Sequence, residues 1–396
     1  MPNTMIAFTF PGQGSQKPGM GEPWVDHPSW ELVEEASVAT GRDVEHLLLR
    51  ADADELTHTR NSQLATMVAS LVVLDAVERL GVEPVAYAGH SLGEYSALVA
   101  SGAIDVADGF RLVGERGEAM QDASTRHPGT MAAVLGLDDD KVAAACEGID
   151  ADVWVANYNA PGQVVIAGHP DAIAAAGDAA KDLGAKRTMS IPVGGAFHTP
   201  YMAPASERLQ AAIAAVEIRD PDLPVVANVD AAIHGDASDW SRLLADQLCS
   251  PVRWRQTLYT LDDLGCTTYV ELGPGTVLSG MVKRTLRNAH TLSVATPDQL
   301  DALLDALHGH DGPPAGFHEG EHLFATERMV VSPAAGVFRP DPSLDAGLEL
   351  APGQLVGLVG DHEVRSPFSG SVVGVLAMDG ERVTASQPIA WLRSAS

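Results

Sequence analysis

The sequence predicts an α/β protein with a largely parallel sheet, followed by a small all-β domain. From residue 1 to about 300, short β-rich apolar runs alternate with Ala-rich helical stretches, the pattern of strands joined by helical crossovers. Residues 301–325 have the Gly-, Pro- and His-rich composition of a linker. Residues 326–396 are β-rich and repeat internally. Because 396 residues exceed the usual size of a single core, we expect two domains, 1–300 and 326–396.

The first two predicted strands are short and buried. Residues 5–10 are apolar but lack the length and the basic flank of a signal peptide, so we interpret them as the first strand. Residues 85–88 predict a strand that enters a tight turn at Gly89, and the residues from there through Val99 predict a helix. This order of strand, turn and helix is typical of a parallel α/β sheet.

Residues 128–196 show a separate pattern of predicted strands and helices. We expect the order βαββαβ, which is the pattern of a ferredoxin-like subdomain, here inserted into the larger domain. Its predicted elements are a strand at 131–135, a helix at 139–146, strands at 153–156 and 164–167, a helix at 171–183 and a strand near 187–191.

The C-terminal part contains two similar halves. The segment Ser-Pro-Ala-Ala-Gly at 332–336 recurs as Ser-Pro-Phe-Ser-Gly at 366–370, and the run that begins at Gln354 has a counterpart at Gln387. Each half is too short to bury a core of its own. The repeat therefore predicts a small barrel-sandwich of two sheets with pseudo-twofold symmetry.

Composition excludes several classes of function. The formal net charge is −28, whereas nucleic-acid binding requires a basic surface, so nucleic acid is excluded as a partner. No apolar run approaches the roughly 20 residues of a membrane helix. The three cysteines lie far apart without metal-binding spacing, which favours a reducing, cytoplasmic location. Four histidines of the linker region are interpreted as solvated side chains rather than metal ligands: His308, His310, His318 and His322.

Residues 89–93, Gly-His-Ser-Leu-Gly, fit the GxSxG pattern of a nucleophile elbow. In such an elbow a strained turn between strand and helix exposes the serine Oγ, and the glycines let the backbone pass closely. The helix N-terminus below it favours developing negative charge. Five residues are a weak signal by themselves, but the place of Ser91 between a predicted strand and a predicted helix supports a nucleophile.

His198 is the candidate base for this serine. It lies in the segment 195–200, Gly-Ala-Phe-His-Thr-Pro, where the chain returns from the inserted subdomain. A Ser–His pair would activate Oγ and later protonate a leaving thiolate. A lone histidine is more often structural, and the sequence does not show that the two side chains meet.

Several further blocks accompany the serine and histidine motifs. They begin with FPGQGSQ at residues 10–16 and GHSLGEYSAL at 89–98. The others are Arg116-Gly117 with Met120-Gln121, Asn157-Tyr158-Asn159 with Pro161-Gly162-Gln163, Phe197-His198, Asn228, Gln247-Leu248 with residues 251–254, and residues 271–275. In composition and order these blocks resemble the malonyl-CoA:acyl-carrier-protein transacylases and the acyltransferase domains of polyketide synthases. The resemblance covers about residues 4–295.

The resemblance implies a hydrolase-like core with a parallel sheet and assigns roles at its site. Ser91 would be the nucleophile and His198 the base, with the second ring nitrogen of the histidine bonded to the backbone carbonyl of Gln247. The backbone N–H groups of Gln13 and Leu92 would form the oxyanion hole. Loss of one such donor typically costs on the order of 10²–10³ in rate.

The resemblance also implies how the acyl group is chosen. Arg116 would hold the malonyl carboxylate, a role that suits a planar and permanently charged guanidinium. Asn157 and Asn159 would line the cleft, although both also fit turn structure. Phe197 would crowd an α-methyl branch and so favour malonyl over methylmalonyl, a preference of only about 1–3 kcal/mol.

The C-terminal repeat resembles the biotinyl/lipoyl attachment domain. In that family a lysine at the tip of the hairpin between the halves carries the prosthetic group. Here the hairpin is Gly360-Asp361-His362-Glu363, and no lysine follows Lys283 in the chain. We therefore expect a domain without cofactor, used for stability or for contact with a larger synthase.

The predicted function is transfer of a malonyl group from malonyl-CoA to an acyl carrier protein for fatty acid synthesis. A trans-acting polyketide acyltransferase would use the same chemistry, and GHSLG also occurs in serine esterases and thioesterases, which usually place the histidine last. A pure binding scaffold would not need Ser91, His198 and Arg116 together. Carrier proteins are acidic, so docking on this acidic chain requires local positive clusters, for which the candidates are Lys181, Lys186, Arg187, Lys283, Arg284 and Arg287.

Overall fold

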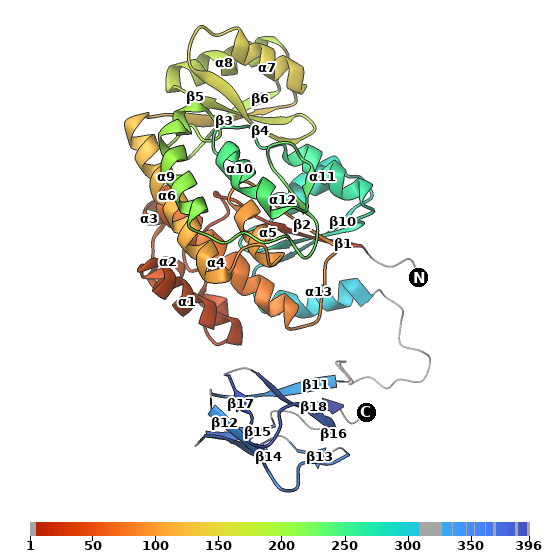
Figure 1. Ribbon diagram of the computed structural model, residues 1–396. Helices are drawn as coiled ribbons and strands as arrows, with labels where there is room; N and C mark the ends of the chain where they lie inside the picture. Colours follow the sequence, from red (N-terminus) through yellow and green to blue (C-terminus); the bar gives the residue numbers. More distant parts are fainter. Residues whose placement is uncertain are drawn as a thin grey trace. The chain divides into compact units, whose positions relative to one another are not determined.

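The computed structural model of the chain describes residues 5–308, 327–334, 336–345, 347–351, 353–360, 362–366, 370–384 and 387–393 (Figure 1). The chain divides into two compact units, Met1–His310 and Asp311–Ser396. Within the described residues, no helix has both the length and the apolar character that crossing a membrane requires.

The larger unit is built on a six-stranded sheet whose strands are parallel except the last. Its order is β10 (His290–Val294), β9 (Thr268–Leu272), β1 (Ile6–Phe10), β2 (Ala86–Gly89), β7 (Val225–Val226) and β8 (Ile233–His234). Only β8 runs antiparallel to its neighbour. The α/β class predicted from the sequence is therefore confirmed, with a mixed sheet.

Both faces of this sheet are covered, as the alternation of side chains along β1 shows. Ile6, Phe8 and Phe10 belong to the apolar core on one face, which includes α4 (Thr59–Glu78), whereas Ala7 belongs to the core on the other face. Strands buried on both faces are typical of parallel sheets, because the crossover helices lie on either side. Helices pack around the sheet accordingly (Figure 1).

The remaining helices of the larger unit complete these two layers. On the Ala7 face lie α11 (Trp254–Asp263) and α12 (Val277–Thr285), whose Leu258 and Met281 join that core. The others are α1 (Glu31–Thr40), α2 (Val44–Leu49), α3 (Ala53–Thr57), α5 (Gly93–Ala100), α6 (Val106–Arg126), α9 (Ala203–Ala214), α10 (Ala237–Gln247), and the 3₁₀ turns η1 (Glu22–Trp24), η2 (Pro28–Trp30) and η3 (Pro200–Met202).

A second, four-stranded sheet with its own core is inserted between α6 and η3. All its strand pairs are antiparallel, in the order β4 (Val153–Ala160), β5 (Gln163–Gly168), β3 (Thr130–Leu135) and β6 (Arg187–Ile191). Two helices, α7 (Asp139–Glu147) and α8 (Pro170–Asp182), contribute Val142 and Ile173 to its core. The element order is β3-α7-β4-β5-α8-β6. The strand predicted at 153–156 is longer than expected, and β4 includes both Asn157 and Asn159.

The sequence predicts that the linker starts at residue 301, and this boundary is wrong. Residues 301–308 belong to a helix, α13 (Asp298–His308), rather than to an extended segment. Leu300 and Leu303 are buried in the main core, and Leu304 and Leu307 pack against it. The spacing 300, 303, 304, 307 is the apolar stripe of one helix face, and burial of that stripe offsets the cost of ordering the segment. The rest of the predicted linker, with His310, His318, His322 and the side chain of His308, lies outside the described residues.

The smaller unit consists of two four-stranded antiparallel sheets. One has the order β11 (Glu327–Val331), β18 (Pro388–Arg393), β16 (Gly370–Val375), β13 (Glu349–Leu350), and the other β15 (His362–Arg365), β14 (Leu355–Val359), β12 (Gly336–Pro340), β17 (Arg382–Val383). Its described core is apolar and includes Phe338, Val356 and Leu392.

The internal repeat relates these two sheets. A shift by one repeat takes β11 to β15, β12 to β16, β13 to β17 and β14 to β18, and so turns one sheet order into the other. Hydrogen bonds repeat as well: Ser332 N–H donates to Gln387 O at 2.8 Å, and Ser366 N–H donates to Gln354 O at 2.9 Å. Each half thus supplies two strands to each sheet. Ala335, residues 367–369 and Asp361, which belong to the repeated segment and the central hairpin, lie outside the described residues.

Candidate active site

Ser91 lies after the carboxyl end of β2, in the turn that leads into α5. Its φ is 54°, a left-handed value that costs a non-glycine residue roughly 1–3 kcal/mol. A Cβ on Gly89 would lie 1.9 Å from the backbone of Gly93, and a Cβ on Gly93 would lie 2.1 Å from the carbonyl oxygen of Phe10. Gly89 is therefore needed for the start of α5 to pack against the end of β2, and Gly93 for the turn to pass this close to β1.

Other chain segments reach the same edge of the sheet. Gln13 follows β1, Asn228 follows β7 and Gly273 follows β9. Because β9, β1, β2 and β7 are parallel neighbours, their carboxyl ends lie together. Ligand sites of α/β sheets form at this edge.

His198 brings an imidazole to Ser91 from the segment after the second sheet. Its Nε2 lies 2.8 Å from Ser91 Oγ, and its Nδ1 lies 2.9 Å from the backbone oxygen of Gln247. Since a carbonyl oxygen only accepts, Nδ1 carries the proton and Nε2 accepts from the serine hydroxyl. The structure thus joins Ser91, His198 and Gln247 in one chain of hydrogen bonds.

Burial keeps this imidazole neutral. His198 is buried, and desolvation, followed by the nearby charge of Arg116, lowers its pKa to about 3. The hydrogen bond to the Gln247 carbonyl opposes this shift only in part. A neutral imidazole is the form that accepts a proton from a serine hydroxyl.

Arg116 on α6 lies behind the serine and is fully buried. Its Nη2 donates to Ser91 Oγ at 3.2 Å and to Gln247 Oε1 at 2.9 Å, and its Nη1 donates to Gln63 Oε1 at 2.6 Å. The guanidinium carbon lies 5.1 Å from the centre of the Tyr95 ring. Its Nε has no hydrogen-bond partner among the described residues.

A cavity of about 250 Å³ opens in front of Ser91 and His198. Four other residues predicted from the sequence line it, Gln13, Asn157, Asn159 and Phe197, whereas Leu92, Arg116 and Gln247 do not. Much of its wall is apolar, with Met131, Val165, Ile191, Val193, Val277 and Met281 among the residues that line it.

Asn159 is tied to His90, the residue before the serine. Asn159 Oδ1 lies 2.8 Å from His90 Nε2, so this ring nitrogen carries a proton. The imidazole also packs edge-on against Trp254 at 5.5 Å between ring centres. Burial lowers the pKa of His90, so the ring stays neutral.

Three residues that hold the site together were given no role from the sequence: Gln63, Glu94 and Asn228, although Glu94 and Asn228 belong to the blocks that carry the resemblance. Asn228 Oδ1 accepts from the backbone N–H of Ser91 at 2.6 Å, and its Nδ2 donates to Gly89 O at 2.7 Å, so it fixes both sides of the elbow. Glu94 lies three residues after Ser91 and is fully buried. A carboxylate in the first turn of a helix that the pattern predicts to be buried was the available signal.

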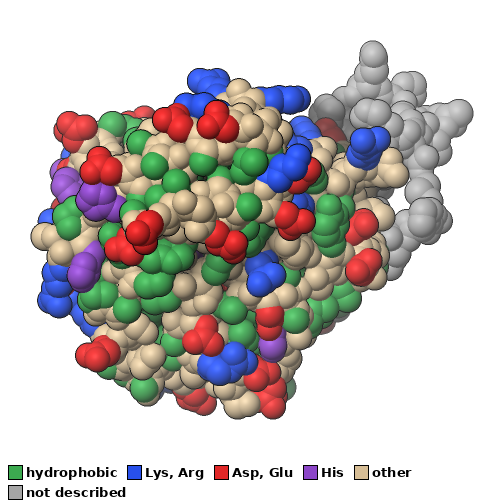
Figure 2. Space-filling view, turned by 90° about the horizontal axis from the view of Figure 1, so that it is seen from above, with side chains coloured by type: hydrophobic (Ala, Val, Ile, Leu, Met, Phe, Trp, Pro, Cys, Tyr) green, Lys and Arg blue, Asp and Glu red, His purple; other side chains and the backbone are tan. Residues whose placement is uncertain are grey.

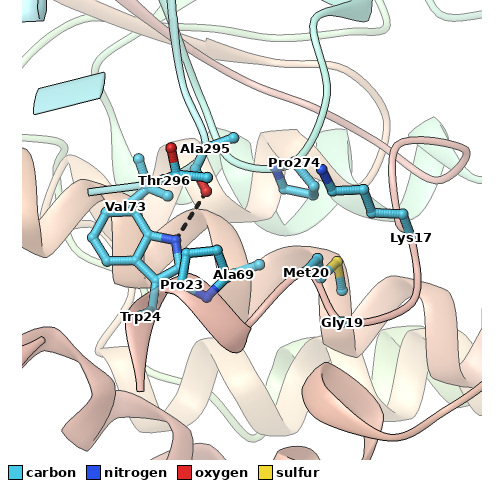
Figure 3. Close-up of a pocket in the computed structure, with 10 residues that line it drawn as sticks. All are labelled: Lys17, Gly19, Met20, Pro23, Trp24, Ala69, Val73, Pro274, Ala295 and Thr296. Atoms are coloured by element: carbon cyan, nitrogen blue, oxygen red, sulfur yellow. Dashed lines mark hydrogen bonds between the residues drawn. The ribbon is translucent and has the colours of Figure 1, made fainter. Parts of the chain in front are cut away.

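A second cavity, of about 50 Å³, lies elsewhere in the larger unit (Figure 3). Trp24, Met20 and Pro274 line it, and the indole Nε1 donates to Ala295 O at 2.9 Å. Lys17 is its only titratable lining residue. It therefore offers neither a nucleophile–base pair nor an acid. Among the described residues no group of three or more His, Cys, Asp or Glu side chains is placed to hold a metal ion.

A strained serine, a neutral histidine and a buried arginine at the carboxyl edge of a parallel sheet define a serine enzyme of acyl transfer. Comparison with known proteins agrees: residues 7–301 match the family described as acyl transferase domain. The chain belongs to this acyl transferase family and, within it, to the malonyl CoA-acyl carrier protein transacylases.

The relatives and solved structures cover about three quarters of this chain. The chain is 40% identical over 307 residues to a malonyl CoA-acyl carrier protein transacylase of Bacillus subtilis (strain 168), covering 76% of this chain and 97% of the relative. It is 41% identical over 306 residues to that of Salmonella typhimurium, covering 76% and 99%.

Solved structures of the same family resemble the fold of this chain. An acyl-carrier-protein S-malonyltransferase from Burkholderia pseudomallei has a TM-score of 0.73 and 42% identity, covering 76% of this chain and 99% of that one. A malonyl-transacylase in complex with its type II PKS acyl-carrier protein has a TM-score of 0.72 and 38% identity, covering 75% and 97%.

Proposed function

We propose that this protein transfers the malonyl group of malonyl-CoA to the thiol of an acyl carrier protein through an ester on Ser91, supplying fatty acid synthesis. The observation that carries the proposal is the contact set of Ser91 Oγ, with His198 Nε2 at 2.8 Å and Arg116 Nη2 at 3.2 Å. A base and a carboxylate-binding cation thus meet at one nucleophile. Relatives that carry this activity in their names share about 40% of the aligned residues.

The reaction proceeds in two half-reactions. Ser91 Oγ attacks the thioester carbon while its proton passes to His198 Nε2, and the C–S bond then breaks as the imidazolium returns this proton to the CoA thiolate. The carrier thiol next gives its proton to His198 and attacks the ester, and Ser91 leaves with that proton. Gln247 O holds the imidazole in the required tautomer throughout.

The oxyanion hole is assigned to the backbone N–H groups of Gln13 and Leu92. The first follows β1 and the second starts α5, so both lie at the edge that carries Ser91. Neither N–H donates to another group within the described residues. Two free donors beside a nucleophile support stabilisation of a developing oxyanion.

Arg116 is assigned to the malonyl carboxylate. The unpartnered Nε supports this role, because a buried guanidinium donor without a partner is costly. Gln63, Ser91 and Met120 line the cavity in front of Arg116. Gln63 Oε1 accepts the hydrogen bond that Arg116 Nη1 donates. The carboxylate therefore replaces Gln63 on the guanidinium, while Phe197 limits the space for a methyl branch. Asn157 and Asn159 complete the polar part of the wall.

The carrier protein is assigned to the mouth of the cavity. Val277 and Met281 of α12 and Ile191 of β6 line the cavity, and the same elements carry the exposed Lys283, Arg284 and Arg187. Figure 2 shows Lys and Arg side chains interspersed with Asp and Glu on the face that it views. Local positive charge is therefore present despite a net charge of −28.

We assign the inserted sheet and its two helices to the ferredoxin-like fold and the main sheet to a hydrolase-like core. The smaller unit is assigned to the biotinyl/lipoyl-like barrel-sandwich, supported by the repeat that relates its sheets. Without an attachment lysine it serves stability or contact with a larger synthase. The three cysteines are unpaired, which supports a reducing cytoplasm.

The test is malonyl transfer by the full chain. Malonyl-CoA and a phosphopantetheinylated acyl carrier protein are supplied, and malonyl-carrier and free malonate are both measured. Malonyl-carrier as the main product supports the proposal. Free malonate as the main product would identify a thioesterase. Parallel assays with a fatty acid carrier and a polyketide carrier decide between the two pathways, the second of which is suggested by the type II PKS complex.

A further inference from the structure

Arg116 carries a buried positive charge without a carboxylate in contact. Its hydrogen bonds go to two amide oxygens and one hydroxyl, those of Gln63, Gln247 and Ser91. No ion pair of Arg116 occurs within the described residues. A buried charge is usually paired, because desolvation without a counter-charge is expensive.

Glu94 is the opposite case, a fully buried carboxyl group without a cation in contact. Its Oε1 accepts from the backbone N–H of Asn228 at 2.6 Å, and its Oε2 accepts from Gln247 Nε2 at 2.5 Å. Both neighbours are donors, so the geometry suits the ionised carboxylate.

The Gln247 side chain stands between these two groups. Its Oε1 accepts from Arg116, which has only donors, so the orientation of the amide is fixed. Its Nε2 donates to Glu94 and to Ser91 O at 2.8 Å. The amide dipole therefore points its oxygen at the cation and its N–H₂ at the anion, which couples the two charges through one side chain.

We infer that Glu94 is the counter-ion of Arg116, relayed by the Gln247 amide, and that it takes up a proton when an acyl carboxylate docks on Arg116. This inference rests on the proposed function, since it needs the carboxylate to reach the guanidinium. Where Glu94 is ionised, at about pH 8 and above, the incoming carboxylate supplies the negative charge that Glu94 gave before. A proton from the buffer then binds a Glu94 carboxyl oxygen, and the site keeps its charge balance.

The surroundings of Glu94 support this exchange. Burial, assisted by the charge of Asp230 after β7, raises the pKa of Glu94 to about 8, against the opposing hydrogen bonds from Asn228 and Gln247 and the charge of Arg116. Tyr95 on α5 and His198 beyond Gln247 are the other titratable groups nearby. A second anion on Arg116 offsets the one cation that favours the carboxylate, so the pKa of Glu94 rises again on binding.

The sign of the effect follows from linkage. Above pH 8 free Glu94 is mostly ionised and the complex binds an extra proton, so affinity for the carboxylated ligand falls as pH rises, by up to about tenfold per unit. Proton uptake is therefore small at pH 7, where free Glu94 is already mostly protonated, and larger at pH 9. A ligand without the carboxylate shows neither effect.

The experiment is calorimetric titration of the full chain carrying Ser91→Ala, which cannot form the ester, with malonyl-CoA. Binding enthalpies in two buffers of different ionisation enthalpy give the protons taken up, at pH 7, 8 and 9. The inference expects uptake that rises with a midpoint near pH 8, and none with acetyl-CoA. Binding without such uptake would overturn the inference and leave the proposed function intact, whereas no binding would overturn both.

Two further variants locate the proton. Glu94→Gln in the Ser91→Ala background removes the uptake at pH 9 if Glu94 is the acceptor, and retained uptake would overturn the assignment. If the Glu94→Gln chain does not fold, His198→Asn in the same background decides, because it removes the other candidate acceptor. Retained uptake with the midpoint near pH 8 then supports Glu94, and its loss assigns the proton to His198.

Discussion

Residues 5–308 bury charged and amide side chains at their centre, whereas the described part of the smaller unit buries only Ser332 and Ser366 among its polar residues. In the larger unit Glu94, Arg116 and Gln247 are all fully buried, and Gln247 is hydrogen-bonded to each of the other two. Buried polar groups cost stability unless each finds a partner. The comparison teaches that the larger unit concentrates buried, hydrogen-bonded charged groups around Ser91, and that the described residues of the smaller unit contain no such cluster.

The two units also differ in how the chain builds its sheets. The main sheet joins parallel strands from residues as far apart as Ile6 and Val294, and its loops meet at one edge. The small sheets interleave strands of two short repeats. In the larger unit, loops from distant segments of the chain meet at one sheet edge and form the site. In the smaller unit, the interleaved strands of the two repeats form an apolar core.

The largest expected effect is at the nucleophile. Ser91→Ala should lower malonyl transfer by at least about 10³-fold, because the ester cannot form. It should change the stability of the chain little, apart from the strain that any non-glycine residue has at φ 54°. Transfer assays and thermal unfolding check this, with the exposed Ser238→Ala as control. Turnover near that of the wild type would place the chemistry elsewhere.

The second largest effect should distinguish the acyl donor that carries a free carboxylate, malonyl-CoA, from the one that does not, acetyl-CoA. Arg116→Ala should lower kcat/KM for malonyl-CoA by the equivalent of about 1.5–3 kcal/mol, the range for charged hydrogen bonds, and that for acetyl-CoA much less. Arg111→Ala on the same helix, whose side chain is half exposed, is the matched control. Equal losses for both donors would make Arg116 a purely structural residue.

A third prediction concerns acid stability. His198 has a pKa of about 3 in the folded chain and 6.5 when unfolded, so the unfolded chain binds the extra proton between these values. Stability is therefore lost as pH falls below 6.5, by about 2 kcal/mol from this group between pH 7 and pH 5. In His198→Gln the same change of pH should cost that much less. Chemical unfolding at both pH values measures it, and identical losses would show that His198 is not buried as the neutral form.

A smaller effect concerns the carrier. Lys283→Glu with Arg284→Glu should lower kcat/KM for the carrier protein about three- to tenfold at low salt, by reversing local charge. Formation of the malonyl ester from malonyl-CoA should not change. Lys141→Glu, on α7 and away from the cavity lining, is the control. Equal rates for all three proteins would move carrier docking to another face.

The smallest effect is expected from loss of the C-terminal unit. A chain that ends after residue 308, and so keeps α13, should retain malonyl transfer within about twofold. Phe338→Ala tests the same point in the full chain, since removal of this fully buried ring costs about 3–5 kcal/mol in the small core. A large drop in turnover of a folded protein would show that the unit contributes to the site.

Much of this organisation was predictable from local pattern. The glycines that flank Ser91 predicted the elbow. The repeat of the segments that begin at Ser332 and Ser366 predicted the two similar sheets of the smaller unit. The helical end of the larger unit was missed because linker composition nearby outweighed the stripe of Leu300, Leu303, Leu304 and Leu307.

The residues that hold the site together were harder to find. Glu94 bonds to Asn228 and Gln247, which lie 134 and 153 positions away. No local periodicity carries such a pairing, since it arises only when α5, the segment after β7, and α10 come together. A buried network of this kind is visible in the structure and not in the pattern of the chain.

The central claim is that the buried polar centre of the larger unit serves one covalent intermediate on Ser91. Mass spectrometry of the full chain after brief incubation with malonyl-CoA alone tests it most directly, with proteolytic mapping of the adduct. The account predicts one malonyl group per chain, located on the peptide that contains Ser91 and absent from Ser91→Ala. An adduct on another residue, or turnover without any adduct, would contradict it.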